Sequence, residues 1–293
     1  DWELFQIESY LERSKDTVSQ PYPIPYEQLR AMPINTARGC PYQCTFCYHA
    51  FFGKPYRTRS AEAIIDEIKF MHERYGVNYL HFWDELTFLS KKQCRRFVES
   101  LIAAQLDVHW SAVCRSDLFG PGDEDLVALM AQSGCLGLGY SLESAAPNIL
   151  AAMNKKLDPL AFIEQTKVLQ SGGLQCWTSL VIGHPLETAK TIELTFETCR
   201  QCRVYPSTGY LLPFPGTVIY EEARKKGVIK DVEEFLLSLG DRQDLHINLT
   251  SMSDEELLEV TMTEVRKTAE ELGVDLPPEK LVKTGVYRGA KRG

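Results

Sequence analysis

The sequence predicts an α/β fold, a partial (β/α)6 TIM-like barrel with a C-terminal helical extension. Short apolar segments alternate with amphipathic segments of helical period about six times along the chain, and short polar loops separate them. This alternation implies a parallel sheet with its helices outside. Six units suggest a barrel that is open on one side. After Pro213 the alternation stops and the pattern becomes helical.

The expected strands are short and rich in apolar residues. The first lies at residues 34–37, directly before a loop that is rich in cysteine. The strand at 136–144 contains glycines, which indicate a close approach of its backbone to a neighbour. The other expected strands are 77–83, 107–113, 174–183 and 208–214.

The expected helices are recognised by the residues at which they begin. Ser60 can cap a helix whose apolar residues fall on one face. Ser90 with Gln93, and Ser253 with Glu256, have the spacing of capping boxes. The other expected helical segments are 123–134, 158–171, 188–203 and 217–240.

These elements divide the chain into three parts. Residues 1–33 form an N-terminal linker or extension, residues 34–215 form the barrel, and residues 216–293 form a helical extension that packs on the barrel. The chain begins without Met, so it is expected to be a fragment or a processed form.

Composition narrows the classes of function. The chain has 293 residues, of which 44% are hydrophobic and 25% are charged, which is ordinary for a globular protein. It has no apolar run long enough to cross a membrane and no apolar leader at its start, so we expect a cytoplasmic protein. The net charge of −8 disfavours a nucleic-acid partner and leaves a small-molecule substrate as the expectation.

Three of the nine cysteines lie within the stretch RGCPYQCTFC, as Cys40, Cys44 and Cys47. The loop follows the first strand, and parallel α/β folds carry their functional groups at such positions. Three thiolates can hold an iron–sulfur cluster and leave one iron open to another ligand. A structural zinc site needs four ligands, for which His49 is the nearest candidate. Zinc binding and a coincidental cysteine-rich loop therefore remain alternatives.

The segment RGCPYQCTFCYHAFFGKPYRTRS resembles the signature loop of radical S-adenosylmethionine (SAM) enzymes, including the aromatic Phe46 before the last cysteine. The resemblance extends over about residues 34–240. It implies a [4Fe–4S] cluster held by the three cysteines, with SAM on the fourth iron and with Phe46 and His49 close to the cofactors. It also implies reductive cleavage of SAM to a 5′-deoxyadenosyl radical, with a reductant such as flavodoxin or ferredoxin.

The resemblance assigns further contacts with SAM to polar residues at strand ends. Asp84 and Glu85 match a polar motif near its amino group, although the common Gly-Gly-Glu form is absent. Arg115 matches the residue that holds its carboxylate, and Glu143 matches a residue that reaches its ribose or amino group. The alternatives are a helix-start signal for the acid pair and a surface salt bridge for Arg115.

The fifth expected strand ends in SLVIGHPLET, which looks like the segment of the family that contacts adenine, here Val181, Ile182 and Gly183. Its alternative interpretation is a hydrophobic strand followed by a turn. The remaining cysteines are expected in the core. Side chains expected to line the substrate side are Tyr140, Trp177, His184 and Tyr210.

The segments WDELTF, SLES and PFPGT resemble the core of cobalamin-dependent radical SAM proteins, which include methyltransferases and the anaerobic cyclase of bacteriochlorophyll synthesis. The cobalt-ligand motif Asp-x-His-x-x-Gly is missing, because Ala112 and Leu249 stand where its glycine would follow His109 and His246. Either the chain is therefore a fragment, with cobalamin held by a domain outside it, or it works without cobalamin.

Three hypotheses about function follow. The first is the catalytic core of a cobalamin-associated radical SAM methyltransferase or cyclase. The second is a radical SAM oxidase, mutase or epimerase that works without cobalamin. The third is a non-catalytic iron–sulfur or zinc protein.

Overall fold

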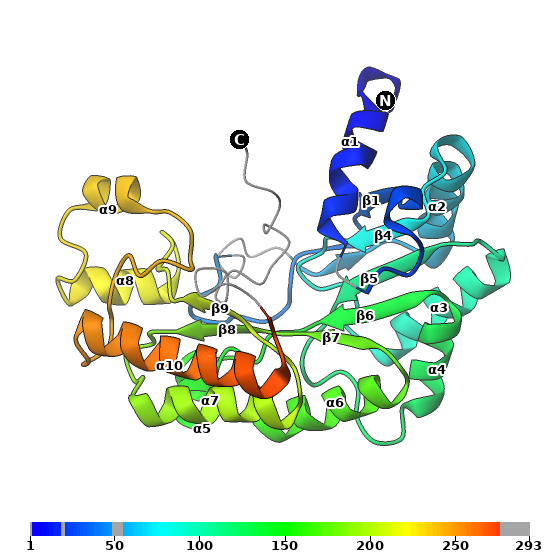
Figure 1. Ribbon diagram of the computed structural model, residues 1–293. Coiled ribbons are helices and arrows are strands. Elements are labelled where there is room, and N and C mark those ends of the chain that lie inside the picture. Colours follow the sequence, from blue (N-terminus) through cyan, green and yellow to red (C-terminus); the bar gives the residue numbers. More distant parts are fainter. Residues whose placement is uncertain (1, 19–20, 49–54, 276–293) are drawn as a thin grey trace.

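The computed structural model describes residues 2–18, 21–48 and 55–275 (Figure 1). Short parallel strands run through its centre, and most helices lie along the outer face of the sheet. Five strands pair in parallel in the order β1 (Ala31–Ile34), β4 (Tyr79–Phe82), β5 (His109–Val113), β6 (Cys135–Gly139) and β7 (Gln175–Trp177). A second parallel pair is formed by β8 (Ser179–Ile182) and β9 (Ser207–Tyr210).

The two sheets form one continuous sheet, which is interrupted at Thr178, between β7 and β8. The backbone N–H of Glu143 donates to the carbonyl of Ser179 at 3.1 Å, and the N–H of Val181 donates to the carbonyl of Glu143 at 3.0 Å. These bonds continue the β6–β7 pairing into β8. The sheet therefore runs from β1 to β9, and these two strands do not pair within the described residues. This arrangement confirms the predicted α/β fold with a partial barrel.

The helices that cover the outside begin close to where the sequence predicted. They are α2 (Ala61–Tyr75), α3 (Lys91–Ala104), α4 (Glu124–Gln132), α6 (Pro159–Ser171) and α7 (Ala189–Gln201). The hydroxyls of Ser60 and Ser90 cap α2 and α3 by accepting from backbone N–H groups at 3.2 Å. The capping box of Ser90 and Gln93 is only half formed, because Gln93 accepts from the N–H of Leu89 instead of that of Ser90.

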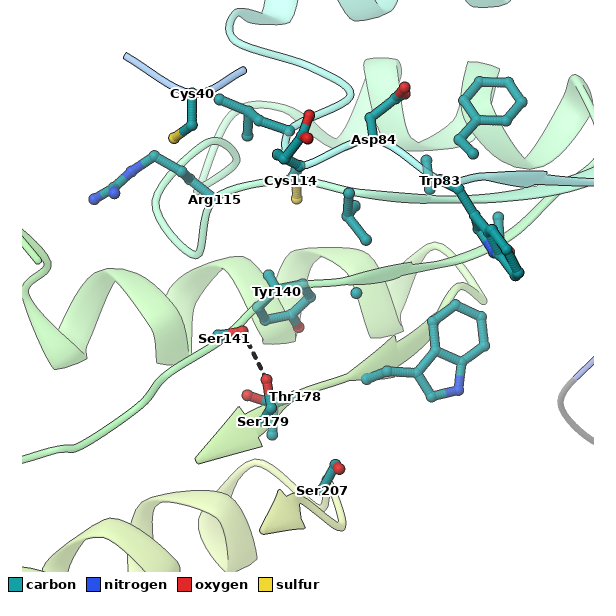
Figure 2. Close-up of a pocket in the computed structure, with 18 of the residues that line it drawn as sticks. Cys40, Trp83, Asp84, Cys114, Arg115, Tyr140, Ser141, Thr178, Ser179 and Ser207 are labelled. Atoms are coloured by element: carbon teal, nitrogen blue, oxygen red, sulfur yellow. Dashed lines mark hydrogen bonds between the residues drawn. The ribbon is translucent and has the colours of Figure 1, made fainter. Parts of the chain in front are cut away.

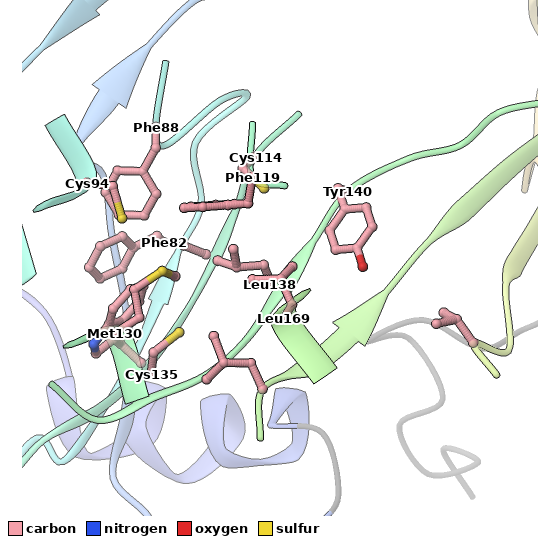
Figure 3. Close-up of a cluster of buried hydrophobic side chains, with 14 of the residues drawn as sticks. Phe82, Phe88, Cys94, Cys114, Phe119, Met130, Cys135, Leu138, Tyr140 and Leu169 are labelled. Carbon is pink, nitrogen blue, oxygen red and sulfur yellow. The ribbon is translucent and has the colours of Figure 1, made fainter. Parts of the chain in front are cut away.

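The main core lies between the sheet and these helices (Figure 3). Trp110 is fully buried and packs against Phe82 and Phe97, with ring centroids 5.3 and 5.4 Å apart. Five cysteines outside the predicted cluster loop are buried, as expected: Cys94, Cys114, Cys135, Cys199 and Cys202.

The C-terminal part of the described chain contains α8 (Val218–Lys225), α9 (Val232–Ser238) and α10 (Asp254–Leu272). Helix α10 packs against α7 through a buried ion pair, in which Arg200 donates to Glu264 at 2.7 Å and to Thr268 at 3.1 Å. The domain boundaries at residues 33/34 and 215/216 stay a prediction.

Several elements differ from expectation. The first strand lies at Ala31–Ile34 and not at 34–37, while Ala37 and Arg38 form a separate strand, β2 (Ala37–Arg38), which pairs antiparallel with β3 (Arg57–Thr58). The expected helix at 217–240 is broken after α8, where Gly227 takes the left-handed conformation with φ 70°. Short helical elements without a strong sequence pattern were not expected: α1 (Ile7–Ser14), α5 (Pro147–Ala152), η1 (Trp2–Leu4), η2 (Lys15–Thr17) and η3 (Tyr26–Gln28).

Candidate active site

A cavity of about 600 Å³ lies inside the partial barrel and is lined from several strand ends (Figure 2). Cys40 follows β2, Asp84 follows β4, Arg115 follows β5 and Glu143 follows β6, and all four line it. Because the strands are parallel, their carboxyl ends bring residues that are distant in sequence to one place. The cavity is therefore the candidate active site.

Cys40, Cys44 and Cys47 all line this cavity as half-buried thiols that are not in disulfides. They lie on a segment that we call the cysteine loop (residues 39–48). The β2–β3 pair closes the base of this loop. Its middle is held by the segment directly after α5, since the N–H of Thr45 donates to the carbonyl of Met153 at 2.9 Å and Asn154 donates to the carbonyl of Gln43 at 2.7 Å.

Asp84 and Glu85 hold the entry to the cysteine loop. The carboxylate of Asp84 accepts from the N–H of Thr36 at 2.8 Å, from its hydroxyl at 2.6 Å and from the N–H of Ala37 at 3.0 Å. Glu85 accepts from the N–H of Gly39 at 3.0 Å. Glu85 therefore contacts the backbone next to Cys40, and Asp84 contacts the chain a few residues earlier, at Thr36 and Ala37. Asp84 is buried with both oxygens engaged, a positioning role that the sequence did not predict.

Arg115 lies on the cavity wall with its guanidinium engaged. It forms a two-point ion pair with Asp117, at 2.9 and 3.1 Å. It also donates to the carbonyls of Lys155 and Lys156, at 3.0 and 2.9 Å, and its guanidinium carbon lies 3.8 Å from the ring centre of Tyr42. Arg115 is thus in an ion pair, but its side chain is only 11% exposed, so the pair is not on the surface. Through Tyr42 and the two carbonyls, the guanidinium connects the cysteine loop to the segment after α5.

Glu143 is buried and pairs with Lys155, whose Nζ lies 2.9 Å from Oε1. Glu143 also has a φ of 63°, which is uncommon for a residue with a side chain and is typical of functional sites that the surrounding structure holds in place. Burial raises the pKa of the nearby Cys44 thiol, and the charge of Lys155 acts in the opposite direction. Lys155 is therefore a cation close to the cysteines.

Some predicted site residues line the cavity and others do not. Phe46, Tyr140 and Trp177 line it. His49 lies outside the described residues. The other predicted residues are buried away from the lining: Val181, Ile182, Gly183, His184 and Tyr210.

Local geometry explains these placements. On β9, Ser207 points into the cavity, so Tyr210 points outward, where it is buried against the core. The ring of His184 accepts from the N–H of Leu186 in the turn after β8, at 3.2 Å. Val181 packs in a small apolar cluster with Leu211 and Phe46, of which only Phe46 lines the cavity. The predicted ligand contacts of His184 and Tyr210 therefore have no support from this geometry.

The cavity also contains residues that sequence reasoning missed. Lys155 and Arg242 come from irregular segments, where no periodicity indicates their direction. The hydroxyl of Ser141, after β6, and that of Ser179, at the start of β8, form a hydrogen bond of 2.7 Å, which Figure 2 draws as a dashed line. His81 lies on β4 with its ring nitrogens 2.7 Å from the Thr17 hydroxyl and 3.3 Å from the Ser111 hydroxyl. Burial lowers the pKa of His81 to about 4.

The donor set of the cysteine loop fits an iron–sulfur cluster. The three thiols are on one loop, face one cavity and are not in disulfides. Within the described residues, no three His, Cys, Asp or Glu side chains are gathered closely enough to chelate a single metal ion. Each cysteine of a [4Fe–4S] cluster binds a different iron, so its sulfurs stand farther apart than the ligands of one ion.

Comparison with known proteins agrees with this donor set. A sequence model of the family described as "Radical SAM superfamily" matches residues 34–199. The chain is 32% identical to "Uncharacterized methyltransferase PH0819" of Pyrococcus horikoshii over 65% of this chain and 41% of that protein. It is 28% identical to the anaerobic magnesium-protoporphyrin IX monomethyl ester cyclase of Rubrivivax gelatinosus, over 80% of this chain and 40% of that protein.

Solved structures show the same fold. The radical SAM methyltransferase TsrM from Kitasatospora setae, with cobalamin and a [4Fe–4S] cluster bound, superposes with a TM-score of 0.57 at 19% identity, over 73% of this chain and 44% of that chain. The cobalamin-dependent radical enzyme OxsB superposes with a TM-score of 0.53 at 16% identity, over 84% of this chain and 36% of that chain. The chain spans less than half the length of the curated relatives named above. Among the described helices, none is long and apolar enough to cross a membrane.

Proposed function

The chain belongs to the radical SAM superfamily, and we propose that it is the catalytic core of a methyltransferase or cyclase that acts on a small organic substrate. One observation carries the proposal. Three thiols of one loop line the same cavity as charged groups from several strand ends. A non-catalytic iron–sulfur or zinc protein would not need such a cavity next to its metal ligands.

Cys40, Cys44 and Cys47 are the proposed ligands of the [4Fe–4S] cluster. When bound, the cluster and SAM supply the 5′-deoxyadenosyl radical that abstracts a hydrogen atom. The protein contributes a fixed loop, since Asp84, Glu85 and Asn154 hold its backbone from two sides. A loop that is held before the cluster binds loses little conformational entropy on binding.

We assign the amino-acid part of SAM to the corner formed by Glu143, Lys155 and Arg115. This corner carries one carboxylate and two cations beside Cys44, which complements an ammonium and a carboxylate on one ligand. Glu85 stays a proposed neighbour of the SAM amino group. Phe46, backed by Val181, is the proposed apolar neighbour of adenine. The contacts of Ile182 and Gly183 with adenine stay a sequence prediction, since both residues are buried away from the cavity lining.

Two further components are proposed from the relatives. Cobalamin is named in the titles of the TsrM and OxsB structures, so we propose that the complete enzyme uses it, held outside the described residues. A one-electron reductant such as flavodoxin or ferredoxin, and a cytoplasmic location, also stay proposals. The use of cobalamin is tested by incubating the protein expressed from the complete gene with hydroxocobalamin and recording its absorbance spectrum. A spectrum without bound cobalamin favours the oxidase, mutase or epimerase class.

The central experiment is anaerobic reconstitution with iron and sulfide, followed by dithionite and SAM. Formation of 5′-deoxyadenosine and S-adenosylhomocysteine is measured by chromatography. We expect product from the wild type and from Cys176→Ala, a matched control because Cys176 is partly buried away from the cavity. We expect none from Cys44→Ala. A well-formed cluster without either product would favour the non-catalytic reading.

A further inference from the structure

The part of the cavity formed next to β9 is built differently from the part next to the cysteines. Ser207 lies across the cavity from Asp84 in Figure 2, with Ser141 and Ser179 between them. Ser207, Tyr205 and Arg242 line this part, which we call the β9 side. It contributes hydroxyls and one guanidinium to the lining.

Arg242 reaches the cavity because a loop runs along the open edge of the sheet. The N–H of Tyr210, at the end of β9, donates to the carbonyl of Arg242 at 2.6 Å. The guanidinium of Arg242 then donates to the hydroxyl of Ser207 at 3.4 Å. The backbone of residue 242 thus pairs with the edge strand while its side chain lies over that strand's inner face.

Gly209 provides the space for this guanidinium. A Cβ atom at residue 209 would lie 2.6 Å from Nη1 of Arg242 and 3.0 Å from its Cζ. Residue 209 is two positions from Ser207, so both face the interior of the barrel. A glycine on the strand and an arginine from the covering loop therefore form one unit.

The other cations of the cavity have carboxylate partners, and Arg242 differs from them in this respect. Arg115 is paired with Asp117, and Lys155 is paired with Glu143. Among the ion pairs found in the described part of the chain, none includes Arg242. Its sequence neighbour Asp241 accepts from the N–H of Gln243 at 3.1 Å. A guanidinium next to a hydroxyl-lined cavity, without a protein carboxylate, suits an anionic ligand.

We propose that Arg242, seated on Gly209 and assisted by Ser207, binds an oxyanion of the substrate, a carboxylate or a phosphate. This inference rests on the proposed function only in placing the substrate in the cavity. It adds a substrate class, an anionic organic molecule whose reacting C–H group faces the cysteine side while its anion is held on the β9 side. Anchoring at the opposite wall orients a flexible substrate for one reactive position.

The test measures binding and needs no turnover. The probes are 4-fluorobenzoate, 4-fluorophenyl phosphate and the neutral 4-fluorobenzyl alcohol, followed by ¹⁹F NMR line broadening on the anaerobically reconstituted protein. We expect at least one anionic probe to bind about tenfold more tightly than the alcohol. The stronger of the two anions distinguishes a carboxylate substrate from a phosphate substrate.

Three variants test whether Arg242 is the residue that causes the preference for anionic probes over the alcohol. Arg242→Gln is expected to abolish it, and Arg266→Gln, an equal charge change on the exposed face of α10, is expected to keep it. Gly209→Ala keeps every charge but displaces the guanidinium of Arg242. It is therefore expected to weaken binding of the anionic probe and to leave binding of the alcohol unchanged. Equal affinity for anions and alcohol in the wild type, or an unchanged preference in Arg242→Gln, would overturn the proposal.

SAM also carries a carboxylate, so a final experiment tests whether SAM and the anionic probe bind at different places. Saturating SAM is expected to leave the affinity for the anionic probe within about twofold, since the two ligands occupy opposite sides. Displacement of the probe by SAM would assign Arg242 to the cosubstrate and refute the substrate role. Failure of 5′-deoxyadenosine formation with intact probe binding would refute the proposed function alone.

Discussion

The cysteine side and the β9 side of the cavity differ in how their polar groups are used. Next to the cysteines, Asp84 is engaged by backbone and hydroxyl donors, and Arg115, Glu143 and Lys155 are in ion pairs. Next to β9, Arg242 has a hydroxyl partner and no ion pair within the described residues. We infer that the polar groups of the cysteine side are organised before any ligand binds. On the β9 side, the charge of Arg242 is left to be paired by an anionic ligand.

Breaking the Glu143–Lys155 pair should have the largest effect on stability. Lys155→Ala leaves the carboxylate of Glu143 buried without its cation, since the two side chains are 8% and 12% exposed. Loss of one partner of a buried pair costs about 3 kcal/mol or more in the free energy of unfolding. Urea denaturation measures it.

The matched control is the double variant Glu143→Gln/Lys155→Met, which removes both charges and should recover most of the loss. A Lys155→Ala variant as stable as the wild type would show that the pair is open to solvent. The cysteine side would then be no more organised than the β9 side.

The titration of His81 tests whether the cavity wall at β4 is dry. Burial lowers its pKa from 6.5 to about 4, so the folded protein keeps the ring neutral where the unfolded chain binds a proton. Stability from this group is present above pH 6.5 and is lost as the pH falls from 6.5 toward 4, by up to about 3 kcal/mol.

Urea midpoints of the wild type and of His81→Gln, measured between pH 7 and pH 4, check this prediction. The wild type should lose more stability than the variant over that interval, and the partly exposed His246→Gln control should follow the wild type. Parallel curves for the wild type and His81→Gln would mean that water reaches the ring.

Asp84→Asn should have an intermediate effect, located at the cysteine loop. The amide keeps one acceptor and turns an NH2 group toward donors of Thr36 or Ala37, so we expect a loss of about 2 kcal/mol. The entry to the loop is then less fixed, so the iron content after reconstitution should also fall. Iron retention equal to that of the exposed Asp66→Asn control would contradict the positioning role.

The sequence predicted the cysteine side better than the β9 side for a physical reason. Cys40, Cys44 and Cys47 are close in the chain, and the spacing of local ligands can be read directly. Arg242 enters from a loop with no periodic pattern, and its place depends on the space above Gly209 in another element. Lys155 was missed for the same reason, since it follows the short helix α5.

Most of the expected strands and helices were found because periodicity is also local; the strand at 34–37 and the helix at 217–240 were not found as predicted. The exact ends were harder to predict. Hydrogen bonds to Asp84 turn the chain at Thr36 and Ala37, which ends β1 earlier than its apolar residues suggest. The irregularity at Thr178 divides one expected strand into β7 and β8, and only the neighbouring strands reveal it.

Tyr210→Phe should have the smallest effect and tests which face of β9 looks into the cavity. Strand residues alternate between faces, so Ser207 and Gly209 facing inward require Tyr210 to face outward, toward Thr261 of α10. Removing its hydroxyl should cost about 1 kcal/mol or less and leave the affinity for the anionic ¹⁹F probe unchanged. Ser207→Ala, from the inner face of the same strand, should weaken that probe. If Tyr210→Phe weakened the probe instead, β9 would be turned over, and both Gly209 and Arg242 would leave the cavity with it.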